Sequence, residues 1–118
     1  MFSIGSSRQF DSWWRELGDG ERDAIAMVMR LLQERGPTLQ FPYSSRIRGS
    51  RHRQMRELRV QHMGRPYRIL YVFNPKRSAI LLVGGRKDGS DRWYLQNIPR
   101  ADRLYDQHLT DLQRKDLL

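Results

Sequence analysis

Basic side chains gather in and just after the middle third of this sequence, and their type suits contact with phosphate. The first candidates accompany an alternating apolar stretch: Arg56, Arg59, Arg65, Arg68, Arg86, Lys87 and Arg92. Arginine forks onto phosphate oxygens with two parallel hydrogen bonds and stays charged at any working pH. Phosphodiester cleavage concentrates negative charge on the phosphate, so a preorganised cation there stabilises the transition state more than the ground state. The residues alone favour nucleic-acid binding first and catalysis second.

Tyr94 follows this cluster by a few residues. A phenol titrates near about 10, but neighbouring cations favour its ionised form. Tyr94 is therefore expected to take a proton from an RNA 2′-hydroxyl or, failing that, to stack on a base.

Other kinds of chemistry lack the residues they need. The chain has no cysteine, which excludes disulfides and thiolate metal sites, and its three histidines, His52, His62 and His108, lack metal-ligand spacing. No metal or other cofactor is expected. GxSxG and P-loop patterns are absent as well. Glu57 is the one acid between residues 44 and 87, and we expect it to neutralise a neighbouring arginine rather than to act as a base.

The positive charge is confined to one part of the chain. Residues 44–87 hold 12 Lys and Arg against one acid, whereas 1–43 and 88–118 carry −1 each, in a chain of 118 residues and net charge +9. This confinement indicates a polyanionic partner: nucleic acid first, an acidic protein second, a membrane surface third. No secretory signal is visible and no apolar run approaches the length of about 18 residues that a membrane span needs, so a cytoplasmic protein is expected.

Two helices are predicted before the basic segment, in a single domain of residues 1–118. Apolar side chains recur with helical spacing at Phe10, Trp13, Trp14 and Leu17, and again at Ile25, Val28, Met29 and Leu32. Ser6 or Ser7 is the expected cap of the first helix and Asp19 that of the second, which ends at Gly36-Pro37. The helices are expected to form a hairpin, and residues 1–5 a short strand or arm.

Strands are predicted next. Residues 37–54 have no clear period and read as a mobile connector, which holds Arg46, Arg48, Arg51 and Arg53. Residues 55–73 alternate as a hairpin with a turn near Met63–Arg65, one face apolar and available for helices to cover, the other carrying arginines. Residues 79–83 are apolar throughout and predict a strand of an antiparallel meander that is buried on both faces and central in the sheet.

A last helix completes an α+β fold, in which an N-terminal helix hairpin and a C-terminal helix pack on a small, mainly antiparallel sheet. Ser90 or Asp91 is the expected cap. Pro99 either kinks this helix or begins a separate one, and residues 113–118 are expected to fray.

Four stretches carry a family pattern: SSRIRGSRHRQMRELRV, GRPYRILYVF, LLVGGRKDGSDRWY and IPRADRLYDQHL. With the order of helix pair, basic loop, sheet and terminal helix, they resemble the RelE/ParE toxin superfamily, and within it the HigB-like, phage-derived branch. The resemblance covers nearly the whole chain and implies a RelE-like fold.

This resemblance implies a toxin of a type II toxin–antitoxin pair, an mRNA interferase that cleaves mRNA in the ribosomal A site by attack of a 2′-hydroxyl. Its expected partners are the ribosome, mRNA and a cognate antitoxin of the helix-turn-helix, DNA-binding type. By motif, Arg68 and Lys87 would stabilise the phosphate and the transition state, Tyr94 would stack or transfer a proton, and Arg56 and Arg59 would position the substrate. The RNA-binding set is Arg46, Arg48, Arg51, Arg53, Arg56, Arg59, Arg65, Arg86 and Arg92.

Two points stay open at this stage. Related toxins often place lysines on the first hairpin strand, where this chain has Arg56, Glu57 and Arg59, so the general base is unassigned. The superfamily also includes non-catalytic members of the ParE type that inhibit DNA gyrase. A basic nucleic-acid-binding module without toxicity is the third possibility.

Overall fold

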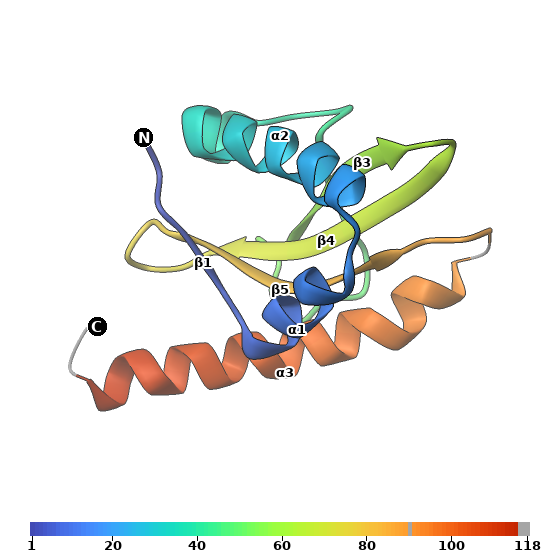
Figure 1. Ribbon diagram of the computed structural model, residues 1–118. Coiled ribbons are helices and arrows are strands. Elements are labelled where there is room, and N and C mark those ends of the chain that lie inside the picture. The colour runs from blue at the N-terminus through green and yellow to red at the C-terminus, as the bar shows by residue number, and fades with distance from the viewer. Residues whose placement is uncertain (90, 116–118) are drawn as a thin grey trace.

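The computed structural model describes residues 1–89 and 91–115, which form one mixed sheet with helices on both faces (Figure 1). The elements in chain order are β1 (Ile4–Ser6), α1 (Arg8–Glu16), α2 (Asp19–Arg35), the short 3-10 helix η1 (Gly36–Thr38), β2 (Ser44–Arg46), β3 (Arg56–His62), β4 (Arg65–Phe73), β5 (Ala79–Arg86) and α3 (Arg92–Arg114). The predicted α+β class is confirmed.

The sheet is built around the predicted meander. Its strand order is β1-β5-β4-β3-β2, so β4 lies at the centre, and β5, which was expected there, lies beside it. Strands β3 and β4 are joined by Met63 and Gly64, whose φ angles of 50° and 75° suit the tight turn of a two-residue hairpin. The prediction of three antiparallel strands joined by short turns is confirmed.

Two short edge strands complete the sheet. The N-terminal segment supplies β1, which pairs with β5 in parallel. The connector supplies β2, which pairs with β3 so that Ser45 lies opposite Glu57. The prediction that residues 37–54 lack regular structure was therefore wrong. A three-residue strand has too few positions to show a period, and its pairing depends on β3, which lies later in the chain.

Each predicted helix boundary has a local cause. The Ser7 hydroxyl accepts a hydrogen bond from the Phe10 amide at 3.0 Å and so caps α1. Helix α2 begins one residue earlier than expected, because Gly18 and not Asp19 is its cap, and the Glu21 carboxylate accepts from the Gly18 amide at 2.8 Å. Helix α3 continues through Pro99, so the alternative of a separate helix was wrong. The Ser90 cap and the end of the fraying segment, residues 116–118, lie outside the described residues.

Helices cover both faces of the sheet (Figure 1). Helices α1 and α2 pack on the face formed by Leu58, Val60, Ile69 and others, with Trp13 and Trp14 against that core. Helix α3 packs on the opposite face, which includes Leu70, Val72 and Leu82. The face of the hairpin that carries Arg68 thus also carries Leu70 and Val72, which α3 covers.

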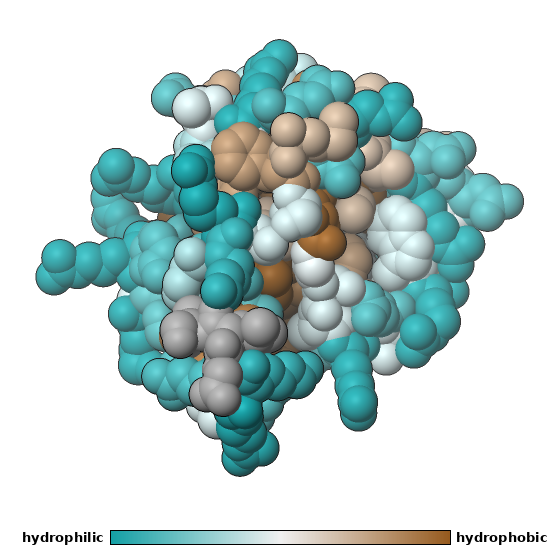
Figure 2. Space-filling view, turned by 90° about the vertical axis from the view of Figure 1, so that its left-hand side faces the viewer, coloured by the Kyte–Doolittle hydropathy of each residue, from teal (hydrophilic) through white to brown (hydrophobic). Residues whose placement is uncertain are grey.

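The other end of the molecule is different in character. Figure 2 shows the side of the molecule that lies on the left in Figure 1, where hydrophilic side chains surround a hollowed apolar patch. Cavities of about 440 and 400 Å³ lie on the two sides of β1, and their linings include Leu82 and Leu81 of β5 respectively. No helix among residues 1–89 and 91–115 is long and apolar enough to cross a membrane.

Candidate functional site

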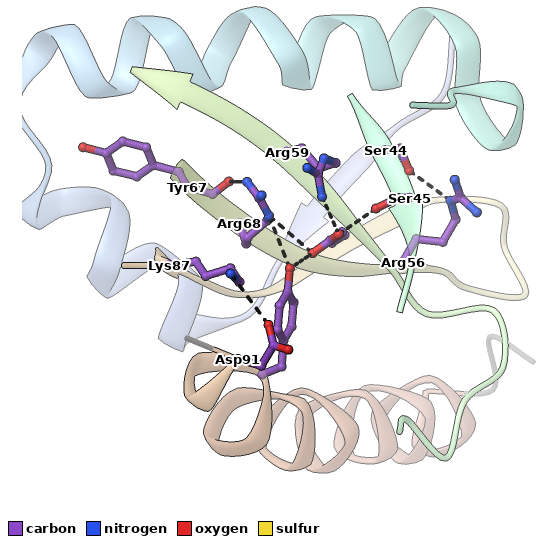
Figure 3. A network of polar contacts seen from close by, with 10 residues as sticks. Ser44, Ser45, Arg56, Arg59, Tyr67, Arg68, Lys87 and Asp91 are labelled. Atoms are coloured by element: carbon purple, nitrogen blue, oxygen red, sulfur yellow. Dashed lines mark hydrogen bonds and ion pairs between the residues drawn. The ribbon is translucent and has the colours of Figure 1, made fainter. Parts of the chain in front are cut away.

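The three residues predicted to be catalytic meet at one end of the sheet. Figure 3 shows Arg68 and Lys87 there. Arg68 lies on β4, Lys87 directly follows β5 and Tyr94 lies in the first turn of α3. The Arg68 Nε donates to the Tyr94 hydroxyl oxygen at 3.3 Å, and the Lys87 Nζ lies 5.7 Å from the centre of the Tyr94 ring. Three distant parts of the sequence thus form one cationic group around a phenol.

The glycine pair before Lys87 is what allows this approach. A Cβ on Gly85 would lie 2.5 Å from the Trp93 indole nitrogen, and one on Gly84 would lie 2.2 Å from the Trp13 ring. Both contacts are shorter than side chains tolerate, so glycine is needed for α3 and α1 to pack against the two faces of β5. Trp93 docked in this way places Tyr94 beside the sheet.

Glu57 links the residues of this cluster to one another. The sequence predicted only that it neutralises a neighbouring arginine. Its side chain is buried, with 4% of the residue exposed. The Tyr94 hydroxyl donates to Oε1 at 2.6 Å, and the Arg68 Nε lies 3.6 Å from the same oxygen. Arg59 donates to Oε2 at 3.1 Å and the Ser45 hydroxyl does so at 2.6 Å. Neutralisation of neighbouring arginines is confirmed, and one carboxylate holds β2, β3, β4 and α3 together.

The environment of Tyr94 opposes its ionisation. Burial raises the pKa of Tyr94, and its hydrogen bond to Glu57 raises that pKa further, while Arg68 acts in the opposite direction to a smaller extent. The predicted phenolate was therefore wrong. The nearest partner of the hydroxyl is an anion from β3, and spacing along the sequence does not reveal it.

A cleft of about 380 Å³ opens beside this cluster. It runs between the segment that follows β2 and the start of α3, and its apolar wall includes Leu95, which is 77% exposed. Tyr94 and Glu57 line the cleft together with two of the predicted RNA-binding arginines, Arg46 and Arg48. The full lining is Arg46, Ile47, Arg48, Glu57, Asp91, Tyr94, Leu95 and Ile98.

Lys87 is held at the side of the cluster. Its side chain is 18% exposed, and its Nζ donates to the Gly89 carbonyl at 3.1 Å and lies 3.8 Å from Asp91 Oδ1. Figure 3 shows Lys87 and Asp91 facing each other where the chain enters α3. The ammonium group is thereby placed next to Tyr94.

Other predicted arginines lie away from the cleft. Arg65 and Arg86 line a separate cavity of about 540 Å³, where the Tyr67 hydroxyl donates to Glu21 at 2.6 Å. This hydrogen bond is the main cause that raises the pKa of Tyr67 and lowers that of Glu21. Arg86 also donates to Asp88 at 2.7 Å. The two arginines thus form a second basic group on the α2 side of the sheet.

Arg53 and Arg56 lie near the far end of β3. They line a hollow of about 610 Å³, and the Arg56 Nε donates to the Ser44 hydroxyl at 2.9 Å. Figure 3 shows Arg56 on the side of β2 away from Lys87. Arg59, by contrast, lies within the cluster and also stacks 5.1 Å from the ring centre of Phe41.

The arginine-rich loop is tied to α3, although a mobile loop was expected. The Ser50 hydroxyl donates to Asp102 at 2.5 Å, the Arg51 side chain pairs with Asp106, and His52 lies 2.8 Å from the same carboxylate. The hydrogen bond with His52 is the largest cause that lowers the pKa of Asp106. Arg51 is therefore neutralised within the fold. Arg92, the first residue of α3, is exposed.

The chain matches the family model of phage-derived Gp49-like proteins over residues 12–106. It is 36% identical over 107 residues to HigB2 of Mycobacterium tuberculosis, a candidate toxin by name. The match covers 89% of this chain and 53% of HigB2, so this chain spans about half the length of that relative. It is 43% identical over 99 residues to the candidate toxin HigB3 of the same organism, with 80% and 82% covered. A chain of the Escherichia coli RelBE toxin–antitoxin complex has a similar fold, with a TM-score of 0.59, 14% identity and coverage of 75% and 100%.

Proposed function

The chain belongs to the family of phage-derived Gp49-like proteins, and on that basis we propose that it is the toxin of a type II toxin–antitoxin pair and cleaves mRNA. Both curated relatives bear the names of candidate HigB toxins, and one of them is matched over most of its length. In this proposal residues 1–118 form one domain that carries the whole cleavage activity.

The observation that carries the cleavage proposal is the convergence of Arg68, Lys87 and Tyr94 beside a cleft with arginines on its rim. A single RNA strand in this cleft would place a phosphate between cations that come from different elements and are already held in position. Because Arg68 is only 8% exposed and held by Tyr94 and the Tyr67 carbonyl, little reorganisation is needed when charge develops.

The reaction that suits this group is attack of a 2′-oxygen on the adjacent phosphorus. The bond from phosphorus to the 5′-oxygen breaks, which leaves a 2′,3′-cyclic phosphate and a 5′-hydroxyl. Arg68 and Lys87 stabilise the charge that accumulates on the phosphate, and Arg59 helps to position the strand. Arg46 and Arg48 hold neighbouring phosphates at the cleft.

The remaining arginines are assigned to contacts outside the cleft. Arg53, Arg56, Arg65, Arg86 and Arg92 would meet flanking RNA, including ribosomal RNA if cleavage takes place in the ribosomal A site. Arg51 and Arg86 contribute less, because Asp106 and Asp88 already pair with them.

The proposed partner is a cognate antitoxin of the helix-turn-helix type, in the cytoplasm. A chain of similar fold occurs with an antitoxin in the RelBE complex, which supports a protein partner of this kind.

The test is to induce the chain without an antitoxin and to map transcript 5′ ends while growth is followed. Wild type should arrest growth and give new 5′ ends in phase with codons, and Arg68→Ala and Lys87→Ala should abolish both. The matched controls are Arg30→Ala and Lys76→Ala, which remove exposed cations outside the site.

Two results would contradict the proposal. Intact transcripts together with a DNA-damage response would indicate a gyrase inhibitor of the ParE type. Normal growth of cells that hold folded wild-type protein would leave a nucleic-acid-binding module without toxicity.

A further inference from the structure

A buried carboxylate borders the cleft and has no role in the charge stabilisation described above. We propose that Glu57 is the proton acceptor for RNA cleavage and that the proton of the attacking 2′-hydroxyl reaches it through Tyr94. This inference rests on the proposed function and adds to it the missing route for the proton.

The carboxylate is oriented for this task. Ser45 and Arg59 occupy Oε2, at 2.6 and 3.1 Å, so Oε1 is directed toward the Tyr94 hydroxyl at 2.6 Å. The position of Ser45 follows from the sheet, since it lies opposite Glu57 in the pairing of β2 with β3. The carboxylate is therefore fixed on one side and available to Tyr94 on the other.

Tyr94 is suited to pass a proton on but not to act as a base alone. Burial and the hydrogen bond to Glu57 raise the pKa of Tyr94, so the phenol keeps its proton at neutral pH. A neutral phenol can accept the 2′-hydroxyl proton only if its own proton leaves at the same time. The one acceptor hydrogen-bonded to its hydroxyl, among the described contacts, is Glu57 Oε1. The 2′-hydroxyl, Tyr94 and Glu57 thus form one chain of hydrogen bonds along which the proton can move.

The other titratable groups near the cleft are less suitable acceptors. Asp91 lies at the edge, with a side chain that is 88% exposed and 3.8 Å from the Lys87 ammonium. His52 is engaged with Asp106, and His62 lines the separate cavity of Arg65 and Arg86. The charged groups that face Glu57 itself are Arg59 from β3 and Arg68 from β4.

The step balances without any further reagent. As the 2′-oxygen bonds to phosphorus, its proton moves to the Tyr94 oxygen and the Tyr94 proton moves to Glu57 Oε1. The bond from phosphorus to the 5′-oxygen breaks, its electron pair stays on that oxygen, and the Lys87 ammonium supplies a proton to it. Exchange with water then returns Glu57 to the carboxylate and Lys87 to the ammonium.

The first experiment compares single-turnover cleavage of a defined mRNA, free and on programmed ribosomes, by wild type, Glu57→Gln and Tyr94→Phe. Each variant should lower the maximal single-turnover rate constant by about 10²–10⁴-fold, because a positioned proton acceptor contributes that much. The protein concentration that gives half of the maximal rate should change little. The double variant should be no slower than the slower single variant, since both residues serve one route. The pH dependence of the cleavage rate should differ between wild type and Glu57→Gln.

A matched control is available in the same chain. Glu21 accepts a hydrogen bond from the Tyr67 hydroxyl at 2.6 Å, the same distance as in the Glu57–Tyr94 pair, but away from the cleft. Glu21→Gln should cleave at the wild-type rate with the wild-type pH profile.

The second experiment separates the two ends of the reaction. An RNA with sulfur in place of the bridging 5′-oxygen has a leaving group that needs no proton. This substrate should restore much of the activity of Lys87→Met but not that of Glu57→Gln or Tyr94→Phe. Restoration of all three alike would overturn the relay.

The outcomes distinguish the two proposals. Wild type that cleaves no RNA in either setting rejects the proposed function. Wild type that cleaves while Glu57→Gln retains its rate and pH profile rejects the relay alone. If thermal unfolding shows that Glu57→Gln does not fold, Tyr94→Phe becomes the test of the relay, because this variant leaves the carboxylate in place. Cleavage by Tyr94→Phe at the wild-type rate overturns the inference.

Discussion

Trp93 lies so close to Gly85 that a Cβ on this glycine would be 2.5 Å from the indole nitrogen. The contact docks the start of α3 on β5 and thereby determines where the neighbouring Tyr94 stands relative to Arg68. A backbone position with no apparent chemical role thus controls the geometry of the candidate site.

Gly85→Ala should lower both stability and activity. The added methyl group has to displace Trp93, and overpacking of this kind costs about 1–3 kcal/mol. Displacement of Trp93 moves Tyr94 away from Glu57, so kcat of the folded fraction should also fall. Gly84→Ala is the contrasting variant, because its methyl group meets Trp13 of α1 instead. Thermal unfolding should show a loss of stability in both variants. Cleavage kinetics, corrected for the folded fraction, should show a lower kcat in Gly85→Ala alone.

Tyr94 should ionise at higher pH than an exposed tyrosine. Its pKa is raised by burial and by Glu57, so its contribution to stability is complete below the unfolded value near about 10 and is lost as pH rises through the folded value. Ultraviolet titration of wild type minus Tyr94→Phe isolates this phenol from Tyr67 and Tyr105, whose pKa values are also raised. When the same comparison is made in a Glu57→Gln background, Tyr94 should ionise at a lower pH than in wild type. A Tyr94 that ionises below the ordinary range would contradict the assignment.

The contacts that Asp106 of α3 makes with the arginine-rich loop should stabilise the fold less at acid pH. The pKa of Asp106 is lowered, chiefly by His52 and then by Arg51, so this carboxylate stabilises the fold above the unfolded value of 3.8, and the contribution disappears as pH falls through the lowered folded value. Asp106→Asn should be less stable than wild type at neutral pH, and the difference should vanish toward strongly acid pH. Chemical unfolding across pH measures it, with Asp23→Asn on the exposed side of α2 as control.

Salt dependence should separate the arginines that meet RNA from those used by the fold. For a single strand, each neutralised phosphate contributes about 0.7 to the slope of log K against log salt. Arg46→Ala and Arg48→Ala should each reduce the slope by roughly that amount, since both residues line the cleft. Arg51→Ala should change it little, because Asp106 occupies the guanidinium. Binding of single-stranded RNA over a series of salt concentrations is the measurement, and equal effects of all three would contradict the cleft assignment.

The sequence by itself determined the elements and the kinds of residue in the site. Helical spacing located α1 and α2, period-two alternation located β3 and β4, and the glycines and prolines located the turns, because each of these signals arises between residues close in the chain. The charge count and the family pattern identified Arg68, Lys87 and Tyr94 before any contact was known. A three-residue strand such as β2 gave no such signal.

Only the tertiary structure decided which of these residues touch. Glu57 and Tyr94 are 37 positions apart and Arg51 and Asp106 are 55 apart, so their contacts depend on the order of the strands and the face that α3 covers. These contacts reversed the expected ionisation of Tyr94 and neutralised Arg51. Charge and hydrogen-bonding partners act over a few ångströms in space, whereas the patterns in a sequence report only neighbours along the chain.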